Sequence, residues 1–440
     1  PDTVAIDFRT TLAAVVINGA TVFDASAFGP DYDMFLAREI SIDEITIILE
    51  RVTKRYRDAG YSLSRAIAPP QDLENGILTV QVIEGYVEKV TFSGDSEHAD
   101  QFAGYAERLT LHRPMTLATL ERYTLAIGDV SAYSVEPALT AIDEESGRYA
   151  LDLKLTHKPI DGVALLNNRG TPEVGRLQTW LSGAVNSALG NRERLEVGFF
   201  TIPNEPEESL YTELTYTQTL GFEGTAFSIS GALSTSDPGS SDASNDVESD
   251  FERLTLAMWH PLIRSRNENL WLRGTFEYRN FHERSLGRTS TNDRLRVVRG
   301  RLGYWLGDLA KGTLSTSVEV SKGINFLGES TTGSNELSRF DGESDFLKAV
   351  IDIVRDQQVA GGFWIQFSAA GQISNDRLLS SEEFSIGGTR FGRGYDFPKL
   401  PATRDSPSLS NRATGGTSAK TGFPAFRYTG STTGVSSGTI

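Results

Sequence analysis

The sequence predicts two small α+β domains followed by an antiparallel β-barrel that spans a membrane. Two observations indicate the small domains: capped amphipathic helices alternate with short apolar strands before residue 159, and the same order of elements occurs twice. A third observation indicates the barrel, because helix signals are absent after Asp161 and long segments of alternating apolar and polar residues replace them.

The first small domain centres on a helix predicted for residues 41–59. Ser41 and Glu44 have the spacing of a capping box, in which each side chain bonds the other residue's backbone N–H, and Gly60 supplies the residue that ends the helix. Apolar residues recur every three or four positions, so one face of the helix packs against a sheet. We expect the strands of that sheet at residues 12–17, 61–66 and 78–82.

The second small domain repeats this order. A strand is predicted from Val87 to Phe92, and helices are predicted near residues 98–109 and from Thr116 to Gly128. Two strands follow, and the second ends before Pro159. The two units are therefore expected to be tandem repeats of one fold.

The barrel prediction depends on the number and length of the strands. The segment 270–281 alternates most clearly, but such a strand fits a soluble sheet with one wet face as well as a barrel with a lipid-facing side. About eleven segments of roughly ten residues, joined by alternately short and long connections, favour the membrane barrel over a large soluble β fold. Within 270–281, the apolar side chains are Leu272, Phe276 and Tyr278, and the polar ones include Arg273, Glu277 and Arg279; the predicted strands are 161–168, 177–186, 193–201, 209–218, 225–235, 250–260, 269–281, 292–305, 312–322, 343–356 and 360–373.

Composition excludes several classes of protein. The 58 acidic and 42 basic side chains give a net charge of −16, which repels polyanions, so nucleic acid is not an expected partner. Cysteine is absent, which excludes disulfides, thiolate metal sites and a cysteine nucleophile. No run of 18 apolar residues predicts a membrane helix, whereas a membrane strand needs only about 9 to 11 residues. The N-terminus shows no leader peptide, so we expect that a leader was removed or that the N-terminus is incomplete.

A string that begins at Tyr56, a string that contains Arg393-Gly394-Tyr395 and the second small domain resemble parts of the two-partner secretion transporters of the Omp85 superfamily, which export haemolysins and filamentous adhesins. The resemblance covers roughly residues 8–398. Gly392 stands where the family motif often has valine, and the glycine-rich string alone would also fit a surface turn. The first string is Tyr56-Arg57-Asp58-Ala59-Gly60-Tyr61-Ser62-Leu63-Ser64-Arg65-Ala66, continued by Pro69-Pro70-Gln71, Gly76 and Val82-Ile83-Glu84-Gly85; the second is Gly387-Gly388 followed by Arg393-Gly394-Tyr395 after the eleventh strand.

The resemblance implies a domain order, a location and a partner. It places POTRA domains, which are periplasmic in this family, at 1–85 and 86–158, and an outer-membrane β-barrel from 159 to 398, where the family has about 16 strands. The expected function is export of a large exoprotein of the haemolysin or adhesin type, captured unfolded by the POTRA domains and passed through the barrel. The expected partners are this exoprotein and the lipid of a Gram-negative outer membrane.

Three groups of residues are candidate sites. A free POTRA strand edge can add an unfolded chain as an extra strand, and we expect the segment after the helix to do so. Polar side chains of 270–281 are expected to keep a lumen wet, and an arginine that is costly to bury unpaired is expected to latch the glycine-rich loop. The client-binding candidates are Gly60, Tyr61, Ser64, Arg65, Pro69, Pro70 and Gln71; the lumen candidates are Arg273, Glu277 and Arg279; the latch candidates are Gly387, Gly388, Arg393, Gly394 and Tyr395.

Residues 399–440 do not continue the strand pattern. They are rich in Ser, Thr and Gly, and they contain neither sustained alternation nor a C-terminal aromatic strand. We expect the last strands to be missing through a frameshift or wrong termination after Pro398, and Thr421-Gly422-Phe423-Pro424-Ala425-Phe426 resembles a remnant of the late barrel. A disordered low-complexity tail is the alternative.

No enzyme, metal or cofactor site is predicted. The histidines lack paired ligand spacing, no Gly-x-Ser-x-Gly string occurs, and the glycine-rich string lacks the lysine of a phosphate loop. The acidic loop at 237–250 lacks the EF-hand spacing. Two rival functions remain open: an Omp85-type insertase for other outer-membrane proteins, which usually has more POTRA domains, and a passive porin or receptor, which needs none.

Overall fold

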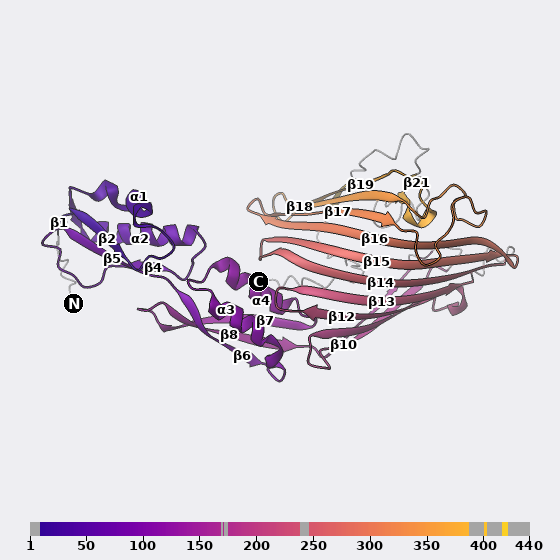
Figure 1. The fold of residues 1–440 in the computed structure, drawn as a ribbon, viewed down its shortest axis with the longest axis horizontal. Helices are drawn as coiled ribbons and strands as arrows, with labels where there is room; N and C mark the ends of the chain where they lie inside the picture. The colour runs from indigo at the N-terminus through magenta and orange to yellow at the C-terminus, as the bar shows by residue number, and fades with distance from the viewer. Residues whose placement is uncertain are drawn as a thin grey trace. The chain divides into compact units, whose positions relative to one another are not determined.

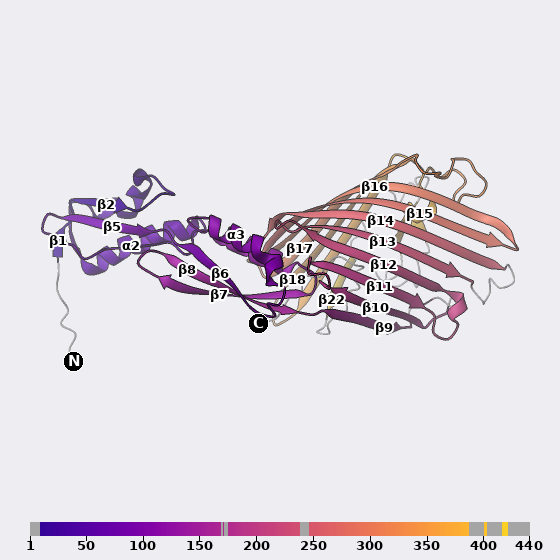
Figure 2. The same ribbon diagram turned by 60° about the horizontal axis from the view of Figure 1, so that its bottom comes forward.

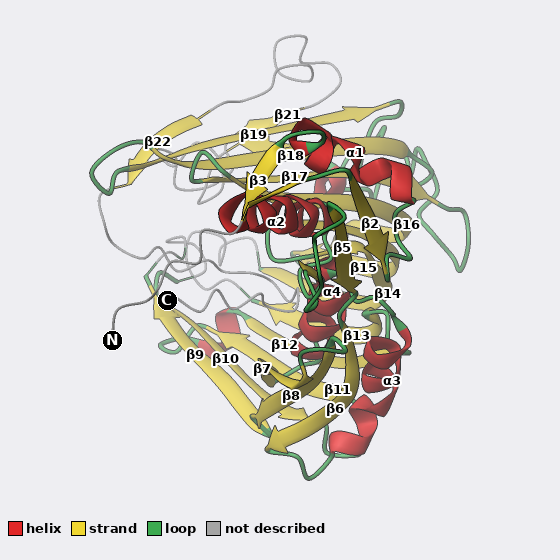
Figure 3. Cartoon of the chain, turned by 90° about the vertical axis from the view of Figure 1, so that its left-hand side faces the viewer, coloured by secondary structure: helices red, strands yellow, loops and turns green. Residues whose placement is uncertain are grey.

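The chain forms two compact units in a computed structural model, which describes residues 9–168, 170, 175–237, 246–386, 400–402 and 416–420. The first unit comprises Pro1–Gly128 and Tyr133–His157, and the second comprises Asp129–Ala132 and Lys158–Ile440 (Figure 1). The α-helices of the described residues all lie before Asp129. Figure 3 draws helices in red and labels α1 to α4.

The first unit begins with a small sheet packed on α2 (Ile42–Asp58). The Ser41 hydroxyl accepts a hydrogen bond from the Glu44 N–H, and the Glu44 carboxylate accepts one from the Ser41 N–H, so the predicted capping box is present. The apolar face of α2 is buried against the sheet in one core. The sheet order is β2-β5-β4, with β2 parallel and β4 antiparallel to β5. The bounds are β1 (Arg9–Thr11), β2 (Ala14–Asn18), η1 (Ala25–Phe28), α1 (Gly29–Tyr32), η2 (Asp33–Phe35), β3 (Glu39–Ser41), β4 (Arg65–Ile67) and β5 (Ile77–Ile83), and β1 pairs with β3.

The strand predicted for 61–66 is shorter than expected and begins at Arg65. Gly60 adopts a left-handed φ of 90°, and the Tyr61 N–H then donates to the Tyr56 carbonyl, which closes the helix end. The Ser64 N–H donates back to the Tyr61 carbonyl, so residues 61–64 form a turn. Helix capping and the turn together use the backbone groups that an earlier strand would have needed.

The second half of the first unit repeats the arrangement. Its sheet order is β6-β8-β7, with β6 parallel and β7 antiparallel to β8. Buried side chains of α3, such as Tyr105 and Leu109, and of β8, such as Leu151 and Leu153, form its interior. The bounds are β6 (Tyr86–Gly94), η3 (Ala99–Phe102), α3 (Ala103–Leu111), α4 (Leu117–Gly128), β7 (Tyr133–Asp143) and β8 (Arg148–His157).

The second unit is one large antiparallel sheet, whose strands lie side by side in chain order (Figures 1 and 2). All eleven predicted strands are present. The three longest extend beyond the predicted ends, where the alternation of apolar and polar residues is lost. The bounds are β9 (Ile160–Asn167), β10 (Gln178–Asn186), β11 (Glu193–Thr201), β12 (Leu210–Leu220), β13 (Thr225–Ser236), β14 (Val247–Arg264), β15 (Glu268–Ser285), β16 (Arg288–Asp308), β17 (Gly312–Gly323), β18 (Leu347–Gln358) and β19 (Trp364–Ser374).

Short elements follow the eleventh strand. β20 (Phe384–Ile386) pairs with β21 (Leu400–Ala402), and β22 (Gly416–Lys420) pairs with β19 as a further strand of the large sheet. The sequence did not predict β22, because its small residues carry no alternation and backbone hydrogen bonds alone define it. The Thr421–Phe426 string lies outside the described residues. The remaining short helices are η4 (Pro206–Glu208) and η6 (Ser380–Glu382).

Candidate functional site

The register of the large sheet separates its side chains into two faces. Residues paired across neighbouring strands share a face, and the pairs Leu214–Gly231, Gly231–Leu254 and Leu254–Tyr278 define one row across β12 to β15. The next row joins Tyr216, Ile229, Leu256, Phe276 and Val298. We call this side of the sheet the apolar face.

Large side chains on the apolar face are exposed. Met258 is 55% exposed and Leu233 is 65% exposed, although both lie within strands. A soluble monomer rarely exposes a contiguous apolar patch of more than a few hundred Å², whereas a bilayer is the solvent that such a surface requires. Exposed members of the face include Leu181, Val197, Leu214, Ile229, Leu254, Leu272, Leu302, Val318 and Ile351.

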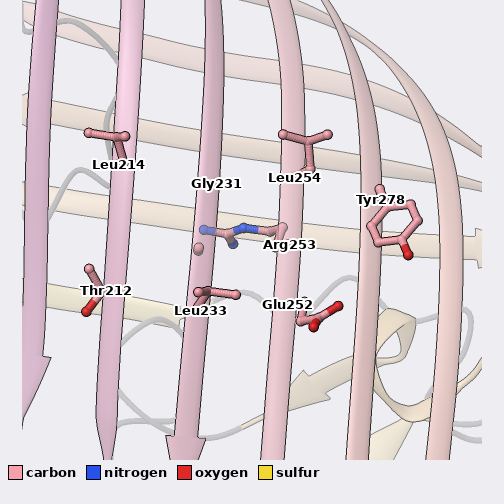
Figure 4. A pocket seen from close by; sticks show the side chains of 9 residues that line it. Thr212, Leu214, Gly231, Leu233, Glu252, Arg253, Leu254 and Tyr278 are labelled. Carbon is pink, nitrogen blue, oxygen red and sulfur yellow. The ribbon is translucent and has the colours of Figure 1, made fainter.

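A shallow groove crosses the apolar face above Gly231. A Cβ placed on Gly231 would have no atom within 4 Å, and the flanking Leu214 and Leu254 leave the space open (Figure 4). On the opposite side of the sheet, Arg253 reaches across β13, and its Nη2 lies 2.8 Å from the Tyr211 hydroxyl of β12. The groove is lined mainly by apolar side chains of the face and therefore offers no set of groups for chemistry.

The opposite side, called the polar face here, carries the predicted lumen candidates. Arg273, Glu277 and Arg279 alternate with the apolar side chains along β15 as expected. The Arg273 guanidinium lies 5.8 Å from the centre of the Trp259 ring on β14. Arg279 and Glu277 lie beside a buried ion cluster that the sequence did not reveal.

The centre of that cluster is Glu382 of η6, whose side chain is 2% exposed. Its Oε1 lies 2.7 Å from Arg299 Nη2, its Oε2 lies 2.5 Å from Lys348 Nζ, and Arg279 binds Oε1 as well. These cations come from β16, β18 and β15. Chain positions so far apart give no local sequence signal, although the alternation places all three cations on the polar face.

The client-binding candidates lie where the two halves of the first unit meet. Gly60 accepts a hydrogen bond through its carbonyl from the Leu117 N–H at 2.8 Å, and the Tyr61 ring packs against Tyr56. Ser64 is 1% exposed, and its Oγ accepts from the Gly85 N–H at 3.2 Å. These groups are engaged within the unit and hold its two sheets together.

The remaining candidates of this group surround the edge strand β4. Arg65 Nη1 lies 3.1 Å from Glu144 Oε2, which ties β4 to the turn between β7 and β8. The Gln71 side-chain amide donates to the Thr79 carbonyl and accepts from the Thr79 N–H, so it occupies the edge of β5 beyond β4. Pro69 is partly buried and Pro70 is exposed. The other edge of β4 pairs with no strand of the described residues.

Glu84, in the string that carries the resemblance, has a structural role. Its carboxylate accepts hydrogen bonds from the Thr21 N–H at 2.7 Å, the Val22 N–H at 3.0 Å and the Tyr56 hydroxyl at 2.7 Å. Burial raises the pKa of Glu84, but the hydrogen bonds from Thr21, Tyr56 and Val22 outweigh it and hold the pKa below its ordinary value. Burial and Glu84 together raise the pKa of Tyr56.

The latch candidates Gly387, Gly388, Arg393, Gly394 and Tyr395 lie outside the described residues. Within the described ranges, no group of three His, Asp or Glu side chains could hold a metal ion. His260 contacts the Thr225 hydroxyl near the end of β14, and His157 stacks on Tyr133. No helix of the described residues has the length and apolar character needed to cross a bilayer.

Two protein-family models match the chain. The model of the ShlB-type POTRA domain matches residues 10–85, and the model of haemolysin secretion/activation proteins of the ShlB/FhaC/HecB type matches residues 151–404. The second match covers more than half of the chain.

Curated proteins that are similar to this chain include outer-membrane and heme/hemopexin transporters. The heme/hemopexin transporter protein HuxB of Haemophilus influenzae (strain 86-028NP) is 21% identical over 367 residues, which cover 82% of this chain and 64% of HuxB. The outer membrane transporter CdiB of Escherichia coli O6:K15:H31 is 24% identical over 417 residues, which cover 88% of this chain and 66% of CdiB. The chain thus spans just under two thirds of the length of these relatives.

Solved structures show the same fold. CdiB from Escherichia coli matches with a TM-score of 0.72 at 20% identity, covering 90% of this chain and 74% of that one. CdiB from Acinetobacter baumannii matches with a TM-score of 0.60 at 16% identity. The architecture of two helix-covered sheets followed by a large antiparallel sheet is therefore that of a POTRA-bearing outer-membrane barrel.

Proposed function

Because the chain belongs to the family of haemolysin secretion/activation proteins of the ShlB/FhaC/HecB type, we propose that it exports a large exoprotein by two-partner secretion. The protein resides in the outer membrane of a Gram-negative bacterium, with its POTRA domains in the periplasm. The observation that carries the proposal is the two-faced sheet, whose apolar face is exposed while its opposite face is lined with ion pairs.

The two faces define the path of the exoprotein. The apolar face contacts lipid, and the polar face, with Arg273, Glu277 and Arg279, lines a wet lumen. An extended polypeptide exposes backbone N–H and C=O groups that need hydrogen-bond partners, and such a lumen supplies them. The outer membrane has no supply of nucleotides, so binding, confinement and folding outside the cell drive the movement.

Capture of the exoprotein uses the edge of β4. An unfolded chain can add as a strand at the outer edge of β4, where it would replace the Thr53 hydroxyl that now accepts from the Ala66 N–H at 2.9 Å. The Gln71 side chain already occupies the neighbouring edge of β5 at Thr79. Pro69 and Pro70 lack N–H donors, so pairing ends at them. Gly60, Tyr61, Ser64 and Arg65 hold the edge in place.

Deletion of the gene tests the function. We expect one large exoprotein to disappear from the medium and to accumulate in the periplasm, and complementation to restore it; quantitative proteomics of both fractions is the measurement. An unchanged medium would contradict the proposal. In that case, a loss of many other outer-membrane barrels would favour an insertase, and slower uptake of a small solute would favour a porin.

A further inference from the structure

The buried cluster on the polar face has the composition of a carboxylate-binding site. Arg299 donates through Nη2 to Glu382 Oε1 at 2.7 Å and through Nη1 to Oε2 at 3.1 Å, which is the bidentate geometry of a strong arginine–carboxylate pair. Lys348 binds both the carboxylate and the Glu382 carbonyl, the latter at 3.0 Å. Arg279 completes the site, so three cations surround one carboxylate.

The site belongs to the wall and its ligand belongs to a loop. Ser321 lies between Arg299 and Lys348 in one cross-strand row of β16, β17 and β18. Glu382 comes from η6, which follows β19, and its carbonyl also accepts from Gln372 Nε2 at 3.1 Å. Glu382 therefore joins the segment after β19 to three strands through its side chain and to β19 through its carbonyl.

Residues on either side of Glu382 make further contacts that hold the segment 378–383 in place. Leu378 and Leu379 pack with Leu295 and Val297 of β16 in one apolar cluster. Glu383 turns away from the strands and binds Arg339 Nη1 of the connection between β17 and β18 at 2.8 Å. Two adjacent glutamates thus hold the segment 378–383 against different partners.

We infer that Arg279, Arg299 and Lys348 form a carboxylate-binding site whose ligand is Glu382, and that this contact is a latch that docks the segment 378–383 on the polar face. Glu382 is a positioning residue. The inference concerns the lumen assigned under the proposed function, yet it stands on contacts within the sheet and needs no exoprotein for its test.

The charge balance explains why docking depends on the Glu382 carboxylate. Glu277 lies 3.4 Å from Arg299 Nη2 and neutralises part of the charge. Glu319, which accepts from the Ser321 hydroxyl at 3.3 Å, neutralises a further part of the charge. Without Glu382, these two carboxylates face three buried cations. Removing one partner of a buried ion pair leaves uncompensated charge, which water or another anion must then solvate. Loss of Glu382 therefore favours departure of the segment and hydration of the wall beneath it.

A single cysteine reports on docking. The chain contains no cysteine, and Ser321, which is fully buried beneath the latch, accepts a hydrogen bond from Arg299 Nη1. In the full-length protein carrying Ser321→Cys, we expect slow reaction with N-ethylmaleimide. Adding Glu382→Gln should accelerate the reaction by about tenfold or more, because the buried pairs are lost. Glu382→Asp should restore part of the protection.

The matched control is Glu383→Gln, which removes the same charge from the next residue, also nearly buried, but leaves the wall site intact. Its labelling rate should stay within about twofold of the parent, because loss of a pair with a loop arginine leaves the wall charges compensated. Heat-modifiable migration on gels checks that each barrel is folded. If Glu382→Gln does not fold, Glu382→Gln with Lys348→Met removes one charge of each sign and should show the same acceleration.

Equal labelling rates in the parent and in folded Glu382→Gln protein would overturn the inference, as would equal acceleration by Glu383→Gln. Labelling proceeds in protein without its exoprotein. The expected labelling rates in a strain that secretes no exoprotein would therefore support docking through Glu382 and count against the proposed function.

Discussion

Single carboxylates fix the ends of elements in both units, and each accepts hydrogen bonds from chain segments far away in sequence. Glu84 joins β5 to the segment after β2 and to Tyr56 of α2. Glu382 joins η6 to the large sheet. At both sites, one ionised carboxylate accepts hydrogen bonds from several donors at once. The contribution of Glu84 and of Glu382 to stability therefore depends on the negative charge of the side chain.

Changing Glu84 to glutamine should lower the local unfolding free energy around α2 by about 1–2 kcal/mol at pH 7, because the bonds to Thr21, Val22 and Tyr56 weaken. Hydrogen exchange of the α2 amides in the full-length protein measures this local unfolding free energy. The pKa of Glu84 is depressed by folding, so its contribution is complete above its ordinary value of 4.5 and is lost as pH falls through the lower folded pKa. The difference between parent and variant should shrink there, and a difference independent of pH would contradict this role.

If Arg393 is the loop latch that the sequence predicts, changing it to alanine should reduce secretion at least about tenfold while barrel abundance changes little, because the loop would lose a charge-assisted hydrogen bond. Secreted exoprotein and heat-modifiable barrel, both quantified by immunoblot, are the readouts. Equal losses of both would reduce the Arg-Gly-Tyr motif to a role in folding.

At the scale of elements, backbone hydrogen bonds of the closely packed Gly85 help to join the two sheets of the first unit. The Gly85 carbonyl accepts from the Met115 N–H at 2.9 Å, and the Gly85 N–H donates to Ser64. A Cβ on Gly85 would lie 2.4 Å from the Leu63 carbonyl oxygen. The resemblance string therefore contains this glycine for a packing reason.

Changing Gly85 to alanine should destabilise this junction by about 1–3 kcal/mol, because the added methyl group overlaps backbone that cannot move aside freely. Faster hydrogen exchange at residues 60–64 and 115–117 is the expected result. Gly128→Ala is the matched control, since its Cβ would meet only a Val135 methyl group at 3.7 Å. Similar exchange in both variants would show that the junction does not depend on Gly85.

Alternation and capping patterns predicted elements better than they predicted sites. All eleven long strands and the Ser41 cap are local patterns, and the structure contains them. The strand expected at 61–66 was too long because helix capping at Gly60 used the same backbone. The Glu382 site could not be predicted, because its cations lie on three strands and meet only when the register is set.

At the scale of the whole chain, the apolar face of the large sheet is suited to lipid and the polar face is suited to water. Neighbouring residues in one strand face opposite sides, so the same substitution at adjacent positions tests both. Ile229 lies on the apolar face and Ser230 on the polar face of β13.

Changing Ile229 to arginine should cost about 2–4 kcal/mol if the residue lies near the bilayer midplane, and it should lower the folded fraction in the outer membrane. Ser230→Arg should fold nearly as well as the parent, since its side chain enters the polar side. Heat-modifiable migration measures the folded fraction. Equal tolerance of both arginines would mean that the apolar face does not contact lipid.

Photo-crosslinking from adjacent positions on β15 tests whether an exoprotein passes along the polar face. A photoreactive phenylalanine derivative in place of Arg273 should crosslink to the exoprotein during secretion, whereas the same group in place of Leu272 should not, because Leu272 faces lipid. Crosslinks from position 272 without crosslinks from position 273 would contradict passage along the polar face. So would the absence of crosslinks from both positions in a strain that secretes the exoprotein.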